Sequence, residues 1–197
     1  MKRALVSLSG IAALTLLALV AVRAEDKFVP VTQKMLENPS PDDWLMYSRT
    51  FDAQRFSPLQ QITRTNVATL KEAFKVELGN GPHESIPIAY RGVLYVQSPG
   101  ASIQALNGAT GETIWEYKYA SGGSSRAKTL SIFEDMVYYP APDGFIVALD
   151  ARTGELLWNT NLGGTIASGP ITYSVDGQQY VAVAGEGALY VFGLPVK

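Results

Sequence analysis

Short hydrophobic runs alternate with polar residues along most of the chain after residue 87. The runs are rich in β-branched and aromatic residues, and Gly, Asn, Asp and Pro separate them. This pattern is typical of short β-strands joined by tight turns and predicts an all-β fold. Before it, residues 25–41 are polar and contain three prolines, so we expect an extended leader with a short helix over residues 32–37. One helical turn within residues 62–70 is predicted to precede a strand over residues 71–78.

The strongest organising signal is an internal repeat. Residues 105–115 read ALNGATGETIW and residues 148–158 read ALDARTGELLW, an offset of 43 residues from Trp115 to Trp158. Residues 91–96 match residues 134–139 at the same offset. A third copy begins at residue 168 and runs to about residue 191 without a tryptophan. Chance similarity of two hairpins is the alternative, and the matching strands outside the motif count against it.

Each repeat is predicted to hold four strands, and a period of about 40 to 50 residues with four strands is that of a β-propeller blade. Within the motif, Asp150 is expected to accept backbone N–H bonds across a tight turn. Gly154 is expected to take the positive φ that this turn needs. Trp158, on the outer strand, is expected to pack against the neighbouring blade.

The first 24 residues follow a different pattern. A cationic start at Lys2 and Arg3 precedes an almost wholly apolar run over residues 4–20, and residues 22–24 read VRA. This order is typical of an export signal that is cleaved after Ala24. An uncleaved anchor helix is the alternative, and the apolar run is short for a span of about 20 residues. We therefore expect a signal peptide at 1–24, a leader at 25–41, a domain at 42–197 and a periplasmic location.

Composition excludes several classes of protein and of site. With 47% hydrophobic and 17% charged residues, the chain is neither disordered nor a charged tail. It has no cysteine and one histidine, His83, which excludes disulfides, thiolate metal sites, a cysteine nucleophile and multi-histidine metal sites. Sixteen basic residues against 18 acidic ones argue against a nucleic-acid surface. Removal of the signal leaves 13 basic residues against the same 18 acidic ones, so the exported chain is mildly acidic.

The motifs resemble those of the pyrroloquinoline quinone (PQQ)-dependent alcohol dehydrogenases, or quinoproteins. Residues 105–115 and 148–158 look like the tryptophan-docking motif of that family's blades. The opening segment is more specific to the dehydrogenases than the blade motif. Its matching positions are Trp44, Tyr47, Arg49, residues 55–59 (RFSPL), Gln61, Ile62, Asn66, Val67 and Leu70. The resemblance as a whole extends over residues 42–197. The resemblance implies a β-propeller that is incomplete, with about three to four blades against the family's eight.

The resemblance also implies cofactor-binding residues. Glu84, in the run HESIP, matches the glutamate that hydrogen-bonds the quinone, and a solvated glutamate at a strand start is the alternative. Lys128, or Arg126 two residues before it, falls where the family places an arginine beside the cofactor's carboxylates; an exposed charge is the alternative. Thr165 and Ser168 resemble hydroxyl-bearing residues on the quinone carbonyl side, or are simple turn residues.

The sequence departs from the family at several positions. It lacks the adjacent cysteine pair beside the quinone and the Cys-x-x-Cys-His motif of covalent haem. No segment matches the catalytic aspartate, so the catalytic residue is unknown. Glu186 matches a calcium-ligating glutamate only loosely, and calcium takes six or more oxygen ligands. No metal ligands are assigned.

Three functions remain open from the sequence. The first is PQQ-dependent oxidation of an alcohol in the periplasm, with calcium polarising the quinone and electrons passing to a cytochrome c. The second is a non-catalytic propeller that binds a protein partner. The third is a truncated, inactive remnant whose unpaired blade edge would favour self-association.

Overall fold

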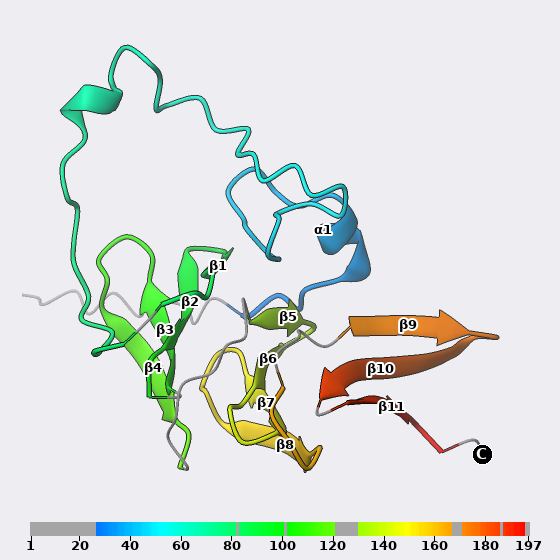
Figure 1. Cartoon of the computed structure of the whole chain (residues 1–197). Helices are drawn as coiled ribbons and strands as arrows, with labels where there is room; N and C mark the ends of the chain where they lie inside the picture. Colours follow the sequence, from blue (N-terminus) through cyan, green and yellow to red (C-terminus); the bar gives the residue numbers. More distant parts are fainter. Residues whose placement is uncertain are drawn as a thin grey trace, which may run out of the picture.

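Three antiparallel sheets lie in a row in the computed structural model of the protein (Figure 1), which describes residues 27–81, 83–100, 102–120, 130–166, 171–185 and 187–195. The first sheet has the strand order β1-β2-β3-β4, the second β5-β6-β7-β8 and the third β9-β10-β11. Neighbouring strands in every sheet are consecutive in the chain. The all-β propeller-type architecture predicted from the sequence is therefore confirmed. The described residues form two four-stranded units and a third unit of three strands.

The strands are short, as the turn residues between the apolar runs require. Their bounds, with those of the two helices, are α1 Gln33–Glu37, a 3-10 helix Val67–Thr69, β1 Ile88–Tyr90, β2 Val93–Ser98, β3 Ser102–Asn107, β4 Thr113–Lys118, β5 Ser131–Phe133, β6 Met136–Pro140, β7 Phe145–Asp150, β8 Leu156–Asn161, β9 Ile171–Val175, β10 Gln178–Gly185 and β11 Ala188–Gly193.

The sequence repeat is also a structural repeat, and it includes the same irregularity in strand pairing. Ala105 pairs with Trp115 in the first sheet, and the register then shifts at the next pair. In the second sheet Ala148 pairs with Trp158, with the same shift at the same place. A bulge of this kind bends the outer strand and increases its twist. The two motifs thus build the same turn and the same outer strand.

The turn of each motif depends on one side-chain acceptor. Asp150 Oδ1 accepts from the backbone N–H groups of Arg152 at 2.8 Å and Thr153 at 3.1 Å, as the sequence predicts. Asn107 does the same in the first sheet, because its Oδ1 accepts from Ala109 N–H at 2.9 Å. A short polar side chain that bonds its own backbone two residues on stabilises such a turn.

Trp115 joins the first sheet to the second. Its indole N–H donates to the Ala151 carbonyl oxygen at 3.0 Å. Its ring lies against Gly154, where an added Cβ would come within 2.6 Å of a ring carbon. Gly154 also has the predicted positive φ, 72°. Glycine is needed at this position for both its backbone conformation and its lack of a side chain.

Apolar side chains between the sheets form two cores. The larger lies between the first and second sheets, and the smaller between the second and third. The larger contains Tyr95, Ile103, Val137, Tyr139, Val147 and Leu149, and the smaller contains Ile146, Leu162, Ile166 and Val183.

The leader packs onto the sheets. The predicted helix is present as α1, and the Thr32 side chain caps it by accepting from Met35 N–H. Just before it, Val31 is completely buried and forms a β-bridge with Glu134 of the second sheet. The predicted signal peptide, residues 1–24, lies outside the described residues.

Two local predictions need correction. The strand predicted over residues 71–78 is not formed, because no described strand lies beside it to supply backbone partners. The helical turn predicted before it is confirmed at Val67–Thr69. Trp158 packs less fully than expected: it contacts Phe192 edge-on at 6.1 Å between ring centroids but is 44% exposed. Among the described residues, the third sheet presents no motif turn to it.

Candidate functional site

Glu84 and Thr165 lie in loops that lead into the first strand of a sheet. Glu84 precedes β1, and Thr165 precedes β9. In a sheet whose strands follow chain order, the loop before the first strand and the turn between the second and third strands lie at the same end. We call this end of the row the loop end.

The other predicted site residues fall outside the described part of the chain. These are Arg126 and Lys128 before β5, and Ser168 before β9. Glu186, the loose calcium match in the β10–β11 turn, lies outside it as well.

The loop between β8 and β9 is held at its start by the second sheet and further along by the third. Leu162 N–H donates to the Gly144 carbonyl oxygen in the β6–β7 turn at 2.8 Å. Ile166 forms a β-bridge with Gly185 at the start of the β10–β11 turn. The loop that carries Thr165 is therefore fixed to both neighbouring sheets.

The first sheet aligns with the second at the same end. The Tyr119 hydroxyl, just after β4, donates to Asp143 Oδ2 in the β6–β7 turn at 3.2 Å. The loop before β1 lies against the β2–β3 turn, where a Cβ on Gly81 would come within 2.9 Å of Pro99. Glu84 and Thr165 thus lie at one end of one row of sheets.

Three polar atoms near Glu84 are buried without a hydrogen-bond partner among the described residues. They are Ser85 Oγ, Gln97 Oε1 and Ser98 Oγ. Gln97 and Ser98 are 6% and 5% exposed. Continuing the β1–β2 register, in which Ile88 pairs with Tyr95, places Ser85 opposite Ser98. Side chains alternate along a strand, so Ser85 and Ser98 share one face of the sheet and Gln97 lies on the other. Buried polar atoms are normally paired, so the two serine hydroxyls are suited to a polar ligand or water.

Sequence reasoning missed Gln97 and Ser98. The available signal is their position at the end of the run VLYVQS, where two polar residues continue an otherwise apolar strand. Both side chains are buried in the folded protein, which no local pattern reveals.

The described residues do not assemble a closed cofactor site. Glu84 and Thr165 are both exposed. In the described ranges no cluster of three or more His, Asp or Glu side chains is arranged to hold a metal ion. PQQ therefore does not fit a complete site within this part of one chain, although the unpaired Ser85 and Ser98 hydroxyl oxygens would suit one side of such a site.

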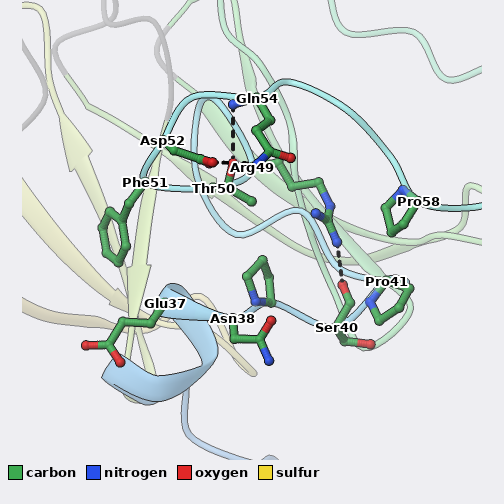
Figure 2. Close-up of a pocket in the computed structure, with 11 residues that line it drawn as sticks. Glu37, Asn38, Ser40, Pro41, Arg49, Thr50, Phe51, Asp52, Gln54 and Pro58 are labelled. Carbon is green, nitrogen blue, oxygen red and sulfur yellow. Dashed lines mark hydrogen bonds between the residues drawn. The ribbon is translucent and has the colours of Figure 1, made fainter.

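A pocket of about 660 Å³ lies elsewhere, between α1 and residues 49–58 (Figure 2). Arg49 is 7% exposed, and its guanidinium donates to the Ser40 carbonyl oxygen at 3.2 Å. Hydrogen bonds from Thr50 and then Gln54 lower the pKa of the Asp52 carboxyl. Neither Glu84 nor Thr165 lines this pocket, so it is separate from the loop end.

The family is decided by the match to known domains. Residues 44–132 and 122–181 match the family model described as glucose/ethanol/alcohol dehydrogenase, beta-propeller domain, of PQQ type. The chain belongs to this family. The resemblance inferred from the tryptophan motifs and the opening segment is confirmed. Since the match extends from Trp44 into the third sheet, these quinoprotein blades include the loops that carry Glu84 and Thr165.

Curated relatives include the dehydrogenase subunit of a quinone alcohol dehydrogenase from Gluconobacter oxydans, 35% identical over 117 residues. That alignment covers 59% of this chain and 15% of the relative. A quinohemoprotein alcohol dehydrogenase, ADH-IIG, from Pseudomonas putida is 39% identical over 79 residues, which are 39% of this chain and 11% of the relative. The alignments thus span only a small fraction of these relatives' length.

Solved structures agree on the fold. The ADHIIG structure from Pseudomonas putida HK5 has a TM-score of 0.65 at 28% identity, over 80% of this chain and 26% of that one. A europium-containing methanol dehydrogenase has a TM-score of 0.64 at 27% identity, over 77% of this chain and 29% of that one.

Within the described residues, no helix has the length and apolar character to cross a membrane.

Proposed function

We propose that this quinoprotein-type chain takes part in PQQ-linked oxidation of an alcohol in the periplasm, with a cytochrome c as electron acceptor. The observation that carries the proposal is the dehydrogenase-domain match, which includes the loops around Glu84 and Thr165. Export by a signal peptide over residues 1–24 is part of the same proposal. PQQ, when bound, would supply the two-electron acceptor that the chain's own side chains lack.

The loop end would contribute one side of the cofactor site. Glu84 is exposed there, and Thr165 is exposed on the loop before β9. The buried hydroxyl of Ser98 lies in the same end of the first sheet. Arg126 or Lys128 would pair with cofactor carboxylates, Ser168 would add a hydroxyl, and calcium would be the accompanying ion.

A titration of the exported chain, residues 25–197, with PQQ and calcium tests the proposal. Cofactor absorbance reports binding, and alcohol-dependent reduction of a dye reports turnover. We expect Glu84→Gln to weaken PQQ binding about tenfold, the loss expected for one hydrogen bond to a charged group. Glu155→Gln is the matched control, because Glu155 is exposed in the motif turn at the opposite end of the second sheet. Unchanged binding in Glu84→Gln, or absence of binding by folded protein, would contradict the proposal.

A non-catalytic propeller that binds a protein is the second candidate. It is favoured by an uncovered apolar face on the third sheet, where Ile171 is 63% and Leu189 69% exposed. Folded protein that binds no PQQ would support this candidate. A chain that neither binds PQQ nor stays in solution would support the third possibility, an inactive remnant.

A further inference from the structure

The outer face of the third sheet is apolar and uncovered. Tyr180 pairs with Tyr173 on one side and Gly193 on the other, and Ala182 pairs likewise with Ile171 and Val191. Residues paired in this way point to the same face of a sheet. That face includes the exposed side chains Ile171, Tyr173, Val175, Leu189 and Val191.

The opposite face of the third sheet is already used. Val183 packs in the core shared with the second sheet, and Tyr190 and Phe192 pack against that core. The outer face is therefore the one that a further sheet would cover. A contiguous apolar face that is left exposed marks an interaction surface.

The third sheet also has an open edge. In the first and second sheets an outer strand, β4 or β8, pairs with the third strand. In the third sheet β11 pairs with β10 alone among the described strands. An open edge offers unpaired backbone N–H and C=O groups to another strand.

At the other end of the row lies a segment with the pattern of an outer strand. Residues 73–78 read AFKVEL. Residues 114–119, which begin one residue into β4 and end one residue after it, read IWEYKY. Phe74, Val76 and Leu78 are half-buried, while Lys75 and Glu77 are exposed. This alternation is that of a strand packed on one face.

The segment docks on the first sheet as β4 docks on the second. A Cβ on Gly111 would come within 2.6 Å of the Phe74 ring, the same distance as between Gly154 and the Trp115 ring. Phe74 thus takes the position of a docking tryptophan. The strand that should lie beside it is missing from the described residues (Figure 1).

We propose that residues 73–78 of one copy pair with the free edge of β11 in a second copy. The pairing would give the third sheet its fourth strand. It would also bring the first sheet of the donor against the apolar outer face, as the first and second sheets already pack within one chain. The occupant is a second copy because this chain's own segment carries the matching pattern and lies at the far end of the row.

The repeat fixes the register. Tyr138 pairs with Ala148, which pairs with Trp158 in turn. Tyr180 pairs with Gly193 at the equivalent place in the third sheet. Phe74 would therefore lie opposite Gly193, and Val76 opposite Val191. A small residue then faces each docking aromatic side chain, as Ala105 faces Trp115.

The association is head-to-tail. The donated strand and the accepting edge are different surfaces, so each copy can donate to one neighbour and accept from another. Such contacts close into a ring or continue as a filament, according to the rotation between copies. The inference concerns assembly alone and does not depend on PQQ binding.

Mass in solution tests the inference first. We expect the exported chain to be dimeric or larger by light scattering across a range of concentrations. Val191→Lys, which places a charge on the outer face, should yield a monomer. Leu157→Lys is the matched control, because Leu157 is 47% and Val191 45% exposed, but Leu157 lies on the second sheet. A monomeric parent, or equal masses for both variants, would overturn the inference.

Cysteine pairs test the register, and they remain decisive where Val191→Lys fails to fold. The chain has no cysteine of its own. Val76→Cys with Val191→Cys should give covalent dimers and larger species with a short bis-maleimide. Val76→Cys with Val175→Cys is the control, since Val175 is exposed on the same face but on β9. Equal cross-linking by the two pairs, or none by the first, would overturn the proposed pairing.

Discussion

The indole nitrogen of Trp115 donates to the carbonyl oxygen of Ala151 at 3.0 Å, across the boundary between the first and second sheets. The same oxygen accepts from the Tyr95 hydroxyl at 3.1 Å. Burial raises the pKa of Tyr95, so this hydroxyl remains a donor over the ordinary pH range. The contact between the first and second sheets thus includes two specific hydrogen bonds inside an apolar core.

This shared acceptor predicts coupling between its donors. We expect Trp115→Phe and Tyr95→Phe each to lower the free energy of unfolding by about 1 kcal/mol, apart from the packing lost with the smaller ring of Trp115→Phe. The double variant leaves the Ala151 carbonyl without either donor and should lose more than the sum of the two. Urea unfolding of all four proteins measures this double-mutant cycle. Strict additivity would show that the two bonds are independent.

Gly154 is expected to be intolerant of any side chain. Gly154→Ala adds a methyl group against the Trp115 ring at a positive φ, and should cost about 2–4 kcal/mol. Gly163→Ala is the control, because its φ is 81° but nothing lies within 4 Å of an added Cβ. It should cost only the backbone strain, about 1–2 kcal/mol. Thermal or urea unfolding compares them, and equal losses would argue against close docking.

Asp150 should make the free energy of unfolding depend on pH in the acid range. Its hydrogen bond with the Arg152 side chain lowers the pKa of its carboxyl below the ordinary value of 3.8. The folded state therefore binds the proton less readily than the unfolded chain. The stabilisation is complete above the ordinary pKa and is lost as pH falls through the lower, folded value.

Asp150→Asn should remove this acid-dependent part while keeping the turn, because Asn107 already serves the same role in the first sheet. Asp150→Ala should lose the turn bonds as well, about 1–2 kcal/mol at neutral pH. Urea unfolding at neutral pH and at a pH below the ordinary aspartate pKa measures both effects. Parallel pH curves for the parent and Asp150→Asn would contradict the assignment.

The two motif tryptophans should differ in their contribution to stability. Trp115 is 8% exposed and Trp158 44%. We expect Trp115→Ala to cost about 3–5 kcal/mol, the range for a buried aromatic side chain. Trp158→Ala should cost less than half as much, since its ring already contacts water. Unfolding by urea compares them under conditions in which both variants are monomeric, and equal costs would contradict the difference in packing.

The sequence by itself determined the repeating unit. The spacing of Asp150, Gly154 and Trp158, copied 43 residues earlier, predicted the turn, the outer strand and the blade, because side-chain capping, positive φ and strand alternation are local properties. The same motifs, with the opening segment, indicated the quinoprotein family. Resemblance of other segments to that family implied cofactor-binding residues, which stay predictions: Glu84, Arg126 or Lys128, Thr165 and Ser168.

Only the tertiary structure decided which surfaces these units bury. Residues 71–78 have the pattern of a strand but form none, since pairing needs a neighbour that local sequence does not supply. Trp158 carries the same motif as Trp115 yet stays half-exposed, because the part of the third sheet that the structure describes presents no motif turn to receive it. Gln97 and Ser98 are polar residues at the end of a strand, and only the folded structure shows that both are buried. Burial depends on contacts between distant segments, and those contacts appear only when the sheets are assembled.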